Sequence, residues 1–414
     1  MSEKAVFLTR AQAEQIRAEF GTPVYVYSEW HLRQQAEKIL AVPAPYGLPV
    51  RFAMKALPTR AILQLFHGLG IEMDASSGYE AERAMLAGIP GKNIQLTAQE
   101  LPKNLDVLVG RGVLYNACSL HQLENYGRLF PGTSVGVRIN PGRGSGVHAK
   151  VNVGGEQASF GIWHEQLDEV KAVVEKHGLV VSTVHTHIGS GTDPVQWQEV
   201  AKLSANFLGE FPTASRLNLG GGFKVARMPE EKSADLREIG VRMVQILEDF
   251  AERTGRRIHL ELEPGTFLTA NVGAILSTVQ DIVSTSAFRF LKLDTGMSEI
   301  IRPAMYGSQH PITVLNGAEE VEEVVVVGHS CESADLLTVN PSDPESPQVR
   351  RLSKASIGDL VVVDGAGAYC SGMSTKNYNS FPEAPEVLLK EDENLTCIRS
   401  RQTLEQMVSN ERSA

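Results

Sequence analysis

The chain has 414 residues, of which 42% are hydrophobic and 21% are charged, a composition typical of a globular protein long enough for two domains. Its net charge of -10 argues against a nucleic-acid surface, and no run of about eighteen apolar residues predicts a membrane span. The first twenty residues carry charges where a signal peptide needs an apolar core, and the four cysteines are widely scattered. We therefore expect a cytoplasmic protein that binds neither nucleic acid nor a membrane.

The first part of the chain alternates between strand and helix patterns. A helix is expected over 11–20, a strand over 23–27, and a second helix from Ser28, a candidate N-cap, to about residue 40. Eight short, buried strand candidates follow, separated mostly by helical patterns, which indicates a parallel sheet. These strands are Val50–Met54, Gly70–Met73, Asn93–Leu96, Val113–Asn116, Ser134–Ile139, Val180–His187, Arg216–Leu219 and His259–Glu263. Eight units predict a closed (β/α)8 TIM-type barrel, with a doubly wound open sheet as the alternative.

Beyond residue 266 the sequence is rich in strand patterns with few helices between them. The expected strands are Gly273–Val283, Phe288–Leu293, Val321–Val327, Asp359–Asp364 and Val387–Leu389. They predict an antiparallel β-sandwich or β-barrel domain, to which the strand at 23–27 adds. We expect 340–347 to be a surface loop and 402–408 to be a short helix. The predicted domains are a barrel over 29–266 and a β domain over 1–28 and 267–414.

Several distinctive residues lie at the expected strand ends where barrel enzymes carry their active sites. Lys55 ends an apolar strand, where partial desolvation would lower its pKa and leave a nucleophilic amine. A lysine that reaches into solvent is the alternative interpretation. The second strand is followed by Asp74, the seventh by three glycines at 220–222, and the eighth ends at Glu263.

The glycines at 220–222 let backbone N–H groups approach an anion closely, and Gly265 follows the next strand. Loops in these positions of a barrel often bind a phosphate, although a flexible loop would also explain the glycines. His185 and His187 share a strand face and suggest a metal pair, but the remaining loops lack the further ligands a barrel hydrolase needs. A histidine ring stacked on a flat cofactor, with Ser190 nearby as a hydrogen-bond donor, is the better interpretation, and simple packing on a buried strand is the alternative for His185.

A lysine together with a phosphate site suggests pyridoxal 5'-phosphate (PLP), bound as a Schiff base. In that case Glu263 would keep the pyridine nitrogen protonated, which makes the ring a strong electron sink and favours loss of CO2. A cationic partner would instead favour proton shuttling, as in a racemase. Without this context, Glu261 and Glu263 would be interpreted as a solvated strand edge.

Motifs along nearly the whole chain then match one family in the family's own order. They are GTPVYVY, RFAMKA, HTHIGSG, LNLGGGF, ELEPG, IRPAMYG, HSCESAD, GAYCSGMS and NYNS. With these motifs the chain resembles the fold-type III, alanine-racemase-like PLP-dependent decarboxylases, and among them the diaminopimelate decarboxylases. The resemblance implies PLP as cofactor, no metal, and conversion of meso-2,6-diaminopimelate to L-lysine and CO2.

The resemblance also implies roles for individual residues. Lys55 would form the Schiff base, His187 would stack on the ring, and Glu263 would pair with the ring nitrogen. Further implied cofactor contacts are Asp74, Ser190, Gly221, Gly222, Gly265 and Tyr369, and implied substrate contacts are Arg302, Tyr306, Glu332 and Tyr369. Cys331 and Glu332 would enter the partner's site, where Cys331 would protonate the substrate carbon and Glu332 would recognise the distal amino group. The family is an obligate dimer for that reason, so a homodimer with shared active sites is expected.

One position departs from the family pattern. Where the family usually reads EPGR, this chain has Thr266, which offers a hydroxyl in place of a guanidinium that grips the substrate's far carboxylate. Arg143, in the loop 141–146, could supply the missing charge. The departure keeps open a decarboxylase of lysine, ornithine or arginine, and a non-catalytic PLP-binding homologue is the alternative from a different class.

Overall fold

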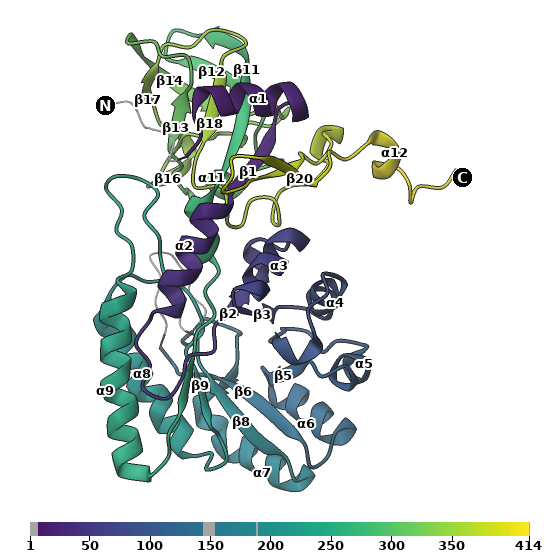
Figure 1. Ribbon diagram of the computed structural model, residues 1–414, viewed down its shortest axis with the longest axis vertical. Helices are drawn as coiled ribbons and strands as arrows, with labels where there is room; N and C mark the ends of the chain where they lie inside the picture. The colour runs from purple at the N-terminus through teal and green to yellow at the C-terminus, as the bar shows by residue number, and fades with distance from the viewer. Residues whose placement is uncertain (1–6, 144–153, 188, 414) are drawn as a thin grey trace. The chain divides into compact units, whose positions relative to one another are not determined.

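The computed structural model describes residues 7–143, 154–187 and 189–413, and the chain divides into two compact units (Figure 1). The barrel unit consists of residues 34–225 and 232–268. The β unit consists of residues 1–33, 226–231 and 269–414. The short segment 226–231 therefore interrupts the sequence of the barrel unit and belongs to the β unit.

Eight parallel strands form the barrel. In chain order they are β2 (Arg51–Ala53), β3 (Glu72–Ala75), β4 (Ile94–Leu96), β5 (Leu114–Ala117), β6 (Ser134–Asn140), β8 (Val180–His185), β9 (Arg216–Asn218) and β10 (His259–Glu261), and each pairs with the next. The first and last strands meet, because Arg51 N donates to Leu262 O at 2.9 Å and Ala53 N donates to Pro264 O at 3.1 Å. The predicted (β/α)8 barrel is confirmed and the open sheet is rejected. A short extra strand, β7 (Ile162–Trp163), pairs with β6.

Helices follow the barrel strands, as the sequence pattern predicts. They are α3 (Arg60–Gly68), α4 (Gly78–Leu86), α5 (Leu105–Gly110), α6 (Leu120–Leu129), α7 (Leu167–His177), α8 (Pro194–Gly209) and α9 (Leu236–Thr254), with 3-10 turns η1 (Met54–Ala56), η2 (Gly91–Asn93) and η4 (His164–Gln166). Several begin at side-chain caps: Ser77 accepts from Glu80 N, and Asp235 accepts from Glu238 N. The helix α2 (Glu29–Leu40) begins after Ser28, whose hydroxyl accepts from His31 N at 3.4 Å.

The β unit is built on a sheet with strand order β17-β14-β12-β11-β1-β19-β20, with β18 on β11 and β13 on β18. Its strands are β1 (Val24–Ser28), β11 (Gly273–Ser284), β12 (Arg289–Leu293), β13 (Ile312–Val314), β14 (Val321–Val327), β17 (Arg350–Ser353), β18 (Leu360–Val363), β19 (Glu386–Leu389) and β20 (Leu395–Arg399). The expected N-terminal strand joins this sheet between β11 and β19. The pairs β1–β19 and β12–β14 are parallel, so the sheet is mixed and not purely antiparallel as predicted.

An amphipathic helix covers part of this sheet. The helix α1 (Arg10–Phe20) buries Ala13 and Ile16 in one cluster with Val24, Val26 and Leu276 of the strands. Burying such aliphatic side chains is the main stabilising contribution to a core of this kind. Short helical segments complete the unit: η5 (Ala270–Val272), α11 (Arg302–Tyr306), η6 (Tyr378–Ser380) and α12 (Leu404–Met407).

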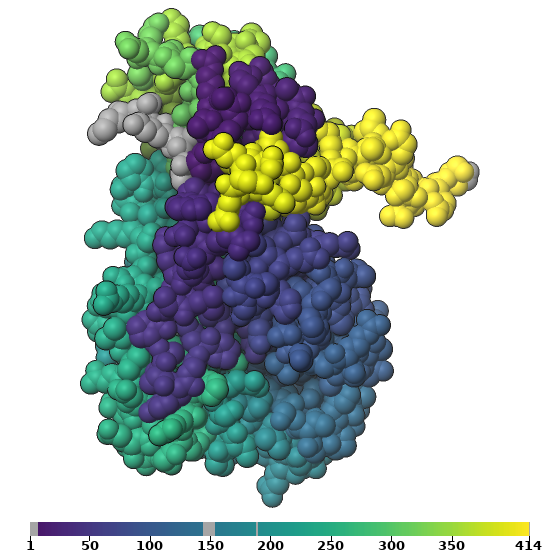
Figure 2. Space-filling view, in the orientation of Figure 1, coloured from purple at the N-terminus to yellow at the C-terminus, as the bar shows by residue number. Residues whose placement is uncertain are grey.

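Two predictions for the C-terminal part have different outcomes. The segment 340–347 is not a loop, because β15 (Val339–Asn340) and β16 (Asp343–Pro347) form a small hairpin. The side chain of Asn340 accepts from Ser342 N at 2.9 Å and closes its turn, while Val339 is fully buried. The final helix is confirmed as α12, and Figure 2 shows the C-terminal segment (yellow) projecting from the surface of its unit. None of the helices within the described residues has the length and apolarity to cross a membrane.

Candidate active site

Lys55 lies in the turn η1, two residues beyond the end of β2. Its neighbours Met54 and Ala56 are buried, whereas the side chain of Lys55 is exposed. This exposed side chain lies at the C-terminal end of a barrel strand, and the lowered pKa of its amine stays a prediction.

Glu263 lies directly after β10 and is buried, with 7% of its surface exposed. Its Oε1 accepts hydrogen bonds from Gln95 Nε2 at 2.7 Å and from Asn218 Nδ2 at 2.6 Å. Burial raises the pKa of Glu263, while the Asn218 hydrogen bond and the charges of nearby cations lower it. Glu261 is fully buried as well, so the alternative of a solvated strand edge is wrong.

His185 supports Glu263 from within the barrel. Its Nδ1 lies 2.6 Å from Asn116 Nδ2, and its Nε2 lies 3.4 Å from Glu263 Oε2. Burial, with the charges of nearby cations, lowers the pKa of His185, so the ring is neutral. With the Asn116 amide as donor to Nδ1, the ring N–H of the neutral tautomer is assigned to Nε2, which lies near the carboxylate but makes no hydrogen bond among the described residues. His185 is therefore a supporting group for Glu263 in this geometry.

His187 lies two residues beyond β8, against the glycine turn that follows β9. It is half-buried, and a Cβ added at Gly220 would lie only 2.5 Å from its Nδ1. Its Nδ1 is buried and has no hydrogen-bond partner among the described residues. Burial lowers the pKa of His187 well below its ordinary value, so it presents a neutral, flat ring. Ser190 is half-buried three residues further on.

The glycine turn has no room for side chains. A Cβ at Gly221 would lie 2.0 Å from the carbonyl oxygen of Glu263, and a Cβ at Gly222 would lie 1.8 Å from that of Gly189. Gly265 is buried after β10, and its carbonyl accepts from Leu268 N. The backbone segments after β8, β9 and β10 therefore come together at one end of the barrel, as a phosphate cradle requires.

Asp74 is the remaining barrel candidate. It lies in β3 next to Ala53 of β2 and is almost fully buried. Burial and the charge of Glu263 raise the pKa of Asp74, whereas the charge of Lys55 lowers it. The structure thus brings Asp74, Lys55, His187 and Glu263 to the same end of the barrel.

Three predicted substrate or cofactor contacts lie in the β unit. Arg302 and Tyr306 begin and end α11, with the Arg302 Cζ 5.9 Å from the Tyr306 ring centroid. Arg302 Nη2 also donates to Ser308 Oγ at 3.3 Å. Tyr369 is half-buried in the turn after β18 and has a positive φ of 56°, a conformation that non-glycine residues seldom adopt. Such backbone strain is often found at functional sites.

Cys331 and Glu332 are exposed on one loop of the β unit. Cys331 N donates to Asn379 Oδ1 at 2.8 Å. The Glu332 carboxylate accepts from Ala334 N at 3.2 Å and from Tyr378 OH at 3.3 Å. The backbone hydrogen bond from Ala334 is the first of the contacts that lower the pKa of Glu332, so the carboxylate stays ionised.

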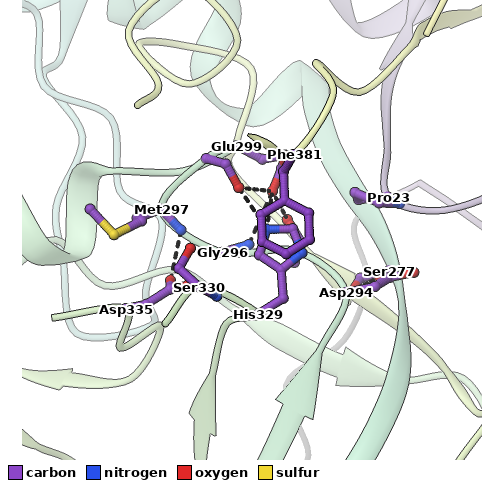
Figure 3. A network of polar contacts seen from close by, with 12 residues as sticks. Pro23, Ser277, Asp294, Gly296, Met297, Glu299, His329, Ser330, Asp335 and Phe381 are labelled. Carbon is purple, nitrogen blue, oxygen red and sulfur yellow. Dashed lines mark hydrogen bonds and ion pairs between the residues drawn. The ribbon is translucent and has the colours of Figure 1, made fainter. Parts of the chain in front are cut away.

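A buried network holds the base of this loop (Figure 3). The Asp335 carboxylate accepts from Met297 N at 2.7 Å and from Ser330 N at 2.8 Å. The ring of Phe381 stacks on His329 with a centroid distance of 3.7 Å, and His329 Nε2 lies 2.6 Å from Ser298 Oγ. The backbone on both sides of Cys331 is therefore fixed even though its side chain is exposed.

Sequence reasoning missed the amides that position Glu263 and His185. Gln95, Asn116 and Asn218 lie in the apolar strands β4, β5 and β9 and are buried there. The available signal was an amide side chain flanked on both sides by apolar residues, at a position whose side chain points into the barrel. The alternative of a metal pair at His185 and His187 finds no further ligands, because the described residues contain no group of three or more His, Cys, Asp or Glu side chains that could hold an ion.

The barrel residues fit PLP. Lys55 offers an accessible amine, Glu263 a buried and hydrogen-bonded carboxylate, and His187 a neutral ring with a buried ring nitrogen that has no partner among the described residues. The glycine turn supplies backbone where a Cβ would not fit. This fold with this site is that of a PLP-dependent barrel enzyme.

Comparisons with known proteins agree with that class. Residues 32–270, more than half of the chain, match the family described as pyridoxal-dependent decarboxylase, pyridoxal binding domain. The diaminopimelate decarboxylase of Streptomyces coelicolor is 35% identical over 95% of this chain and 90% of its own. That of Escherichia coli K12 is 33% identical over 97% of this chain and 96% of its own. A crystal structure of diaminopimelate decarboxylase, 33% identical, superposes with a TM-score of 0.89 over 95% of this chain and 94% of its own. The chain belongs to the diaminopimelate decarboxylase family of PLP-dependent decarboxylases.

Proposed function

We propose that this protein removes one carboxylate of meso-2,6-diaminopimelate as CO2 and forms L-lysine. The observation that carries this function is the buried Glu263 carboxylate, held by two amides at the barrel end where Lys55 presents its amine. Relatives named diaminopimelate decarboxylase that match nearly the whole chain support the choice of substrate.

Bound PLP supplies a carbonyl group that combines with amines and a ring that accepts electrons from a breaking carbon–carboxylate bond. Lys55 supplies the amine that attaches the cofactor. Glu263 holds negative charge at the ring nitrogen, because its Oε1 is fixed by Gln95 and Asn218. His187 places a flat neutral ring against the cofactor.

The other barrel candidates hold the cofactor in place. Ser190, Gly221, Gly222 and Gly265 of the barrel unit would hold the phosphate, and Tyr369 of the β unit is a further proposed contact. Asp74 is close enough to Glu263 that burial and the Glu263 charge raise the pKa of Asp74 and favour its protonated form. A fixed arrangement of this kind costs no reorganisation when charge develops during the reaction.

The β unit recognises the substrate and completes the site of a second subunit. Arg302, Tyr306 and Tyr369 contact the substrate. Cys331 and Glu332 are exposed in this chain, on a loop with fixed backbone, so they are available to enter the partner's site. There the thiol of Cys331 delivers the proton that replaces CO2, and Glu332 recognises the distal amino group. The protein acts as a homodimer in the cytoplasm and does not bind nucleic acid.

The direct test is to incubate the PLP-loaded protein with meso-diaminopimelate and to measure lysine and CO2. Lys55→Ala should lose the borohydride-reducible cofactor linkage and all measurable CO2 release. Full turnover by that variant would reject the assignment of Lys55. A basic amino-acid decarboxylase is the alternative, because Thr266 stands where the family usually has an arginine. Assays with lysine, ornithine and arginine as substrates separate the two functions.

A further inference from the structure

Arg227 lies in the short segment 226–231 that belongs to the β unit. Two side chains fix the backbone of this segment. Asn271 Nδ2 donates to Ala226 O at 2.8 Å, and the Glu231 carboxylate accepts from the backbone N of Arg227 at 2.7 Å and of Met228 at 3.1 Å. The start of the Arg227 side chain is therefore held in a defined position, and the charge of Glu231 also favours the charged form of Arg227.

The guanidinium of Arg227 is also placed by backbone contacts. Its Nε donates to Gly365 O at 2.9 Å, and a Cβ added at Gly365 would lie 2.9 Å from the Arg227 Cδ. The Nη2 of Arg227 is buried and has no hydrogen-bond partner among the described residues, and the same is true of Arg302 Nε. Buried donors in folded proteins are nearly always paired, so these two nitrogens indicate a missing acceptor.

The charges lead to the same conclusion. Burial and the nearby charge of Arg302 lower the pKa of Arg227. Burial, followed by the charges of the same two arginines, lowers the pKa of His310. Within the part of the chain that the structure describes, no ion pair includes Arg227 or Arg302. Because a guanidinium keeps its proton in proteins, two neighbouring and unneutralised arginines favour an anion between them.

We propose that Arg227 and Arg302 together bind the carboxylate that the substrate keeps, the one far from the bond that breaks. This inference rests on the proposed function and extends it to substrate selection. Thr266 offers only a hydroxyl where the family usually has an arginine, so the chain needs a cationic group elsewhere for this carboxylate. Arg143, the candidate that the sequence offered for this charge, is exposed, and its Nη1 lies 3.4 Å from Glu199 Oε2.

The test uses two ligands that differ only in the carboxylate in question. L-lysine carries it, and 1,5-diaminopentane lacks it. Calorimetric titration of the PLP-loaded protein should show tighter binding of lysine. Arg227→Gln should weaken lysine binding roughly 10- to 100-fold, the usual effect of losing a hydrogen bond between charged groups, and should leave 1,5-diaminopentane within about twofold. The KM for diaminopimelate should rise by a similar factor.

Two further variants keep the test decisive. Arg227→Lys keeps the charge but not the paired donors, so it should weaken lysine binding by a smaller factor and covers the case in which Arg227→Gln does not fold. Arg253→Gln, on the exposed face of α9, is the matched control and should change neither ligand. Equal weakening of both ligands, or no change in either, would overturn the inference. A wild-type protein that forms no lysine from diaminopimelate would overturn the proposed function instead, and the comparison of the two ligands would still decide the role of Arg227.

Discussion

Glu263 and His185 face each other inside the barrel, with Glu263 Oε2 3.4 Å from His185 Nε2. The other oxygen of the carboxylate accepts hydrogen bonds from two neutral amide groups. Hydrogen bonds of this kind fix the position of a charge without cancelling it, whereas a bound cation would neutralise it. The carboxylate therefore remains able to stabilise positive charge on a bound ring.

Removing one of these amides should reduce the rate more than the affinity. Gln95→Met is nearly isosteric and deletes the 2.7 Å donor to Glu263. We expect kcat to fall roughly 10- to 100-fold, because hydrogen bonds to charged groups contribute about 1.5–3 kcal/mol. Steady-state kinetics at saturating PLP measures the effect. Gln64→Met, whose amide bonds to Ala87 O on the exposed side of α3, is the control. A kcat within twofold of wild type for Gln95→Met would show that the Gln95 hydrogen bond does not contribute to the rate.

The glycine turn can be tested through cofactor affinity. A Cβ at Gly222 would lie 1.8 Å from the Gly189 carbonyl oxygen, and Gly222 has a φ of +95°. Gly222→Ala must therefore displace the backbone that forms the cradle, and we expect the Kd for PLP to rise at least about 10-fold. Gly209→Ala is a matched control, since a Cβ there meets nothing within 4 Å. Absorbance titration of the cofactor-free proteins gives both constants, and equal constants for the two variants would contradict a cradle at Gly222.

Sequence alone could predict the barrel because its strands are short apolar runs that recur with helices between them. It also located Lys55, Asp74 and Glu263 correctly at strand ends, because reactive groups of barrels gather there. The hairpin at 339–347 was missed, since its sequence has the composition of a loop and its pairing is set by the buried Val339.

The supporting side chains could not be predicted in the same way. Gln95 interrupts its apolar run by one residue, and its partner Glu263 lies 168 residues further along the chain. Nothing in a local pattern reveals a contact over that separation. Arg227 lies in a segment without periodicity, so only the fold shows that it lies near Arg302.

The stacked pair of Phe381 and His329 should matter for the loop that carries Cys331. Phe381→Ala removes a ring 3.7 Å from the imidazole and loosens the base of the loop. We expect the backbone N–H groups of Ser330 and Cys331 to exchange faster and kcat to fall roughly 10-fold, because Cys331, the proposed proton donor, is less well placed. Hydrogen-exchange mass spectrometry of the 328–335 peptide reports the first effect.

A second phenylalanine in the same unit provides the control for Phe381→Ala. Phe288→Ala removes a ring from an edge-to-face pair with Phe290, away from this network. It should leave both the exchange of the 328–335 peptide and the rate unchanged. Unaltered exchange in Phe381→Ala would show that the stacked pair does not hold the loop.

The same network predicts a pH dependence of stability. Burial raises the pKa of Glu299 from 4.5 to about 7, although three hydrogen bonds to its carboxylate oppose the shift. Between these two pH values the folded protein binds a proton more strongly than the unfolded chain does. Stability should therefore fall as the pH rises through this window, by up to about 3 kcal/mol from this group. His329 acts in the opposite direction, because burial lowers its pKa and its neutral form is favoured in the fold.

Comparison with Glu299→Gln isolates the contribution of the carboxyl group, because the amide has nearly the same shape and does not ionise. Urea unfolding from pH 5 to pH 8 should show the variant becoming more stable relative to wild type as the pH rises. Glu252→Gln, on the exposed surface of α9, should follow the wild-type curve throughout. If the stabilities of Glu299→Gln and wild type differ by the same amount at every pH in this range, Glu299 does not titrate within it.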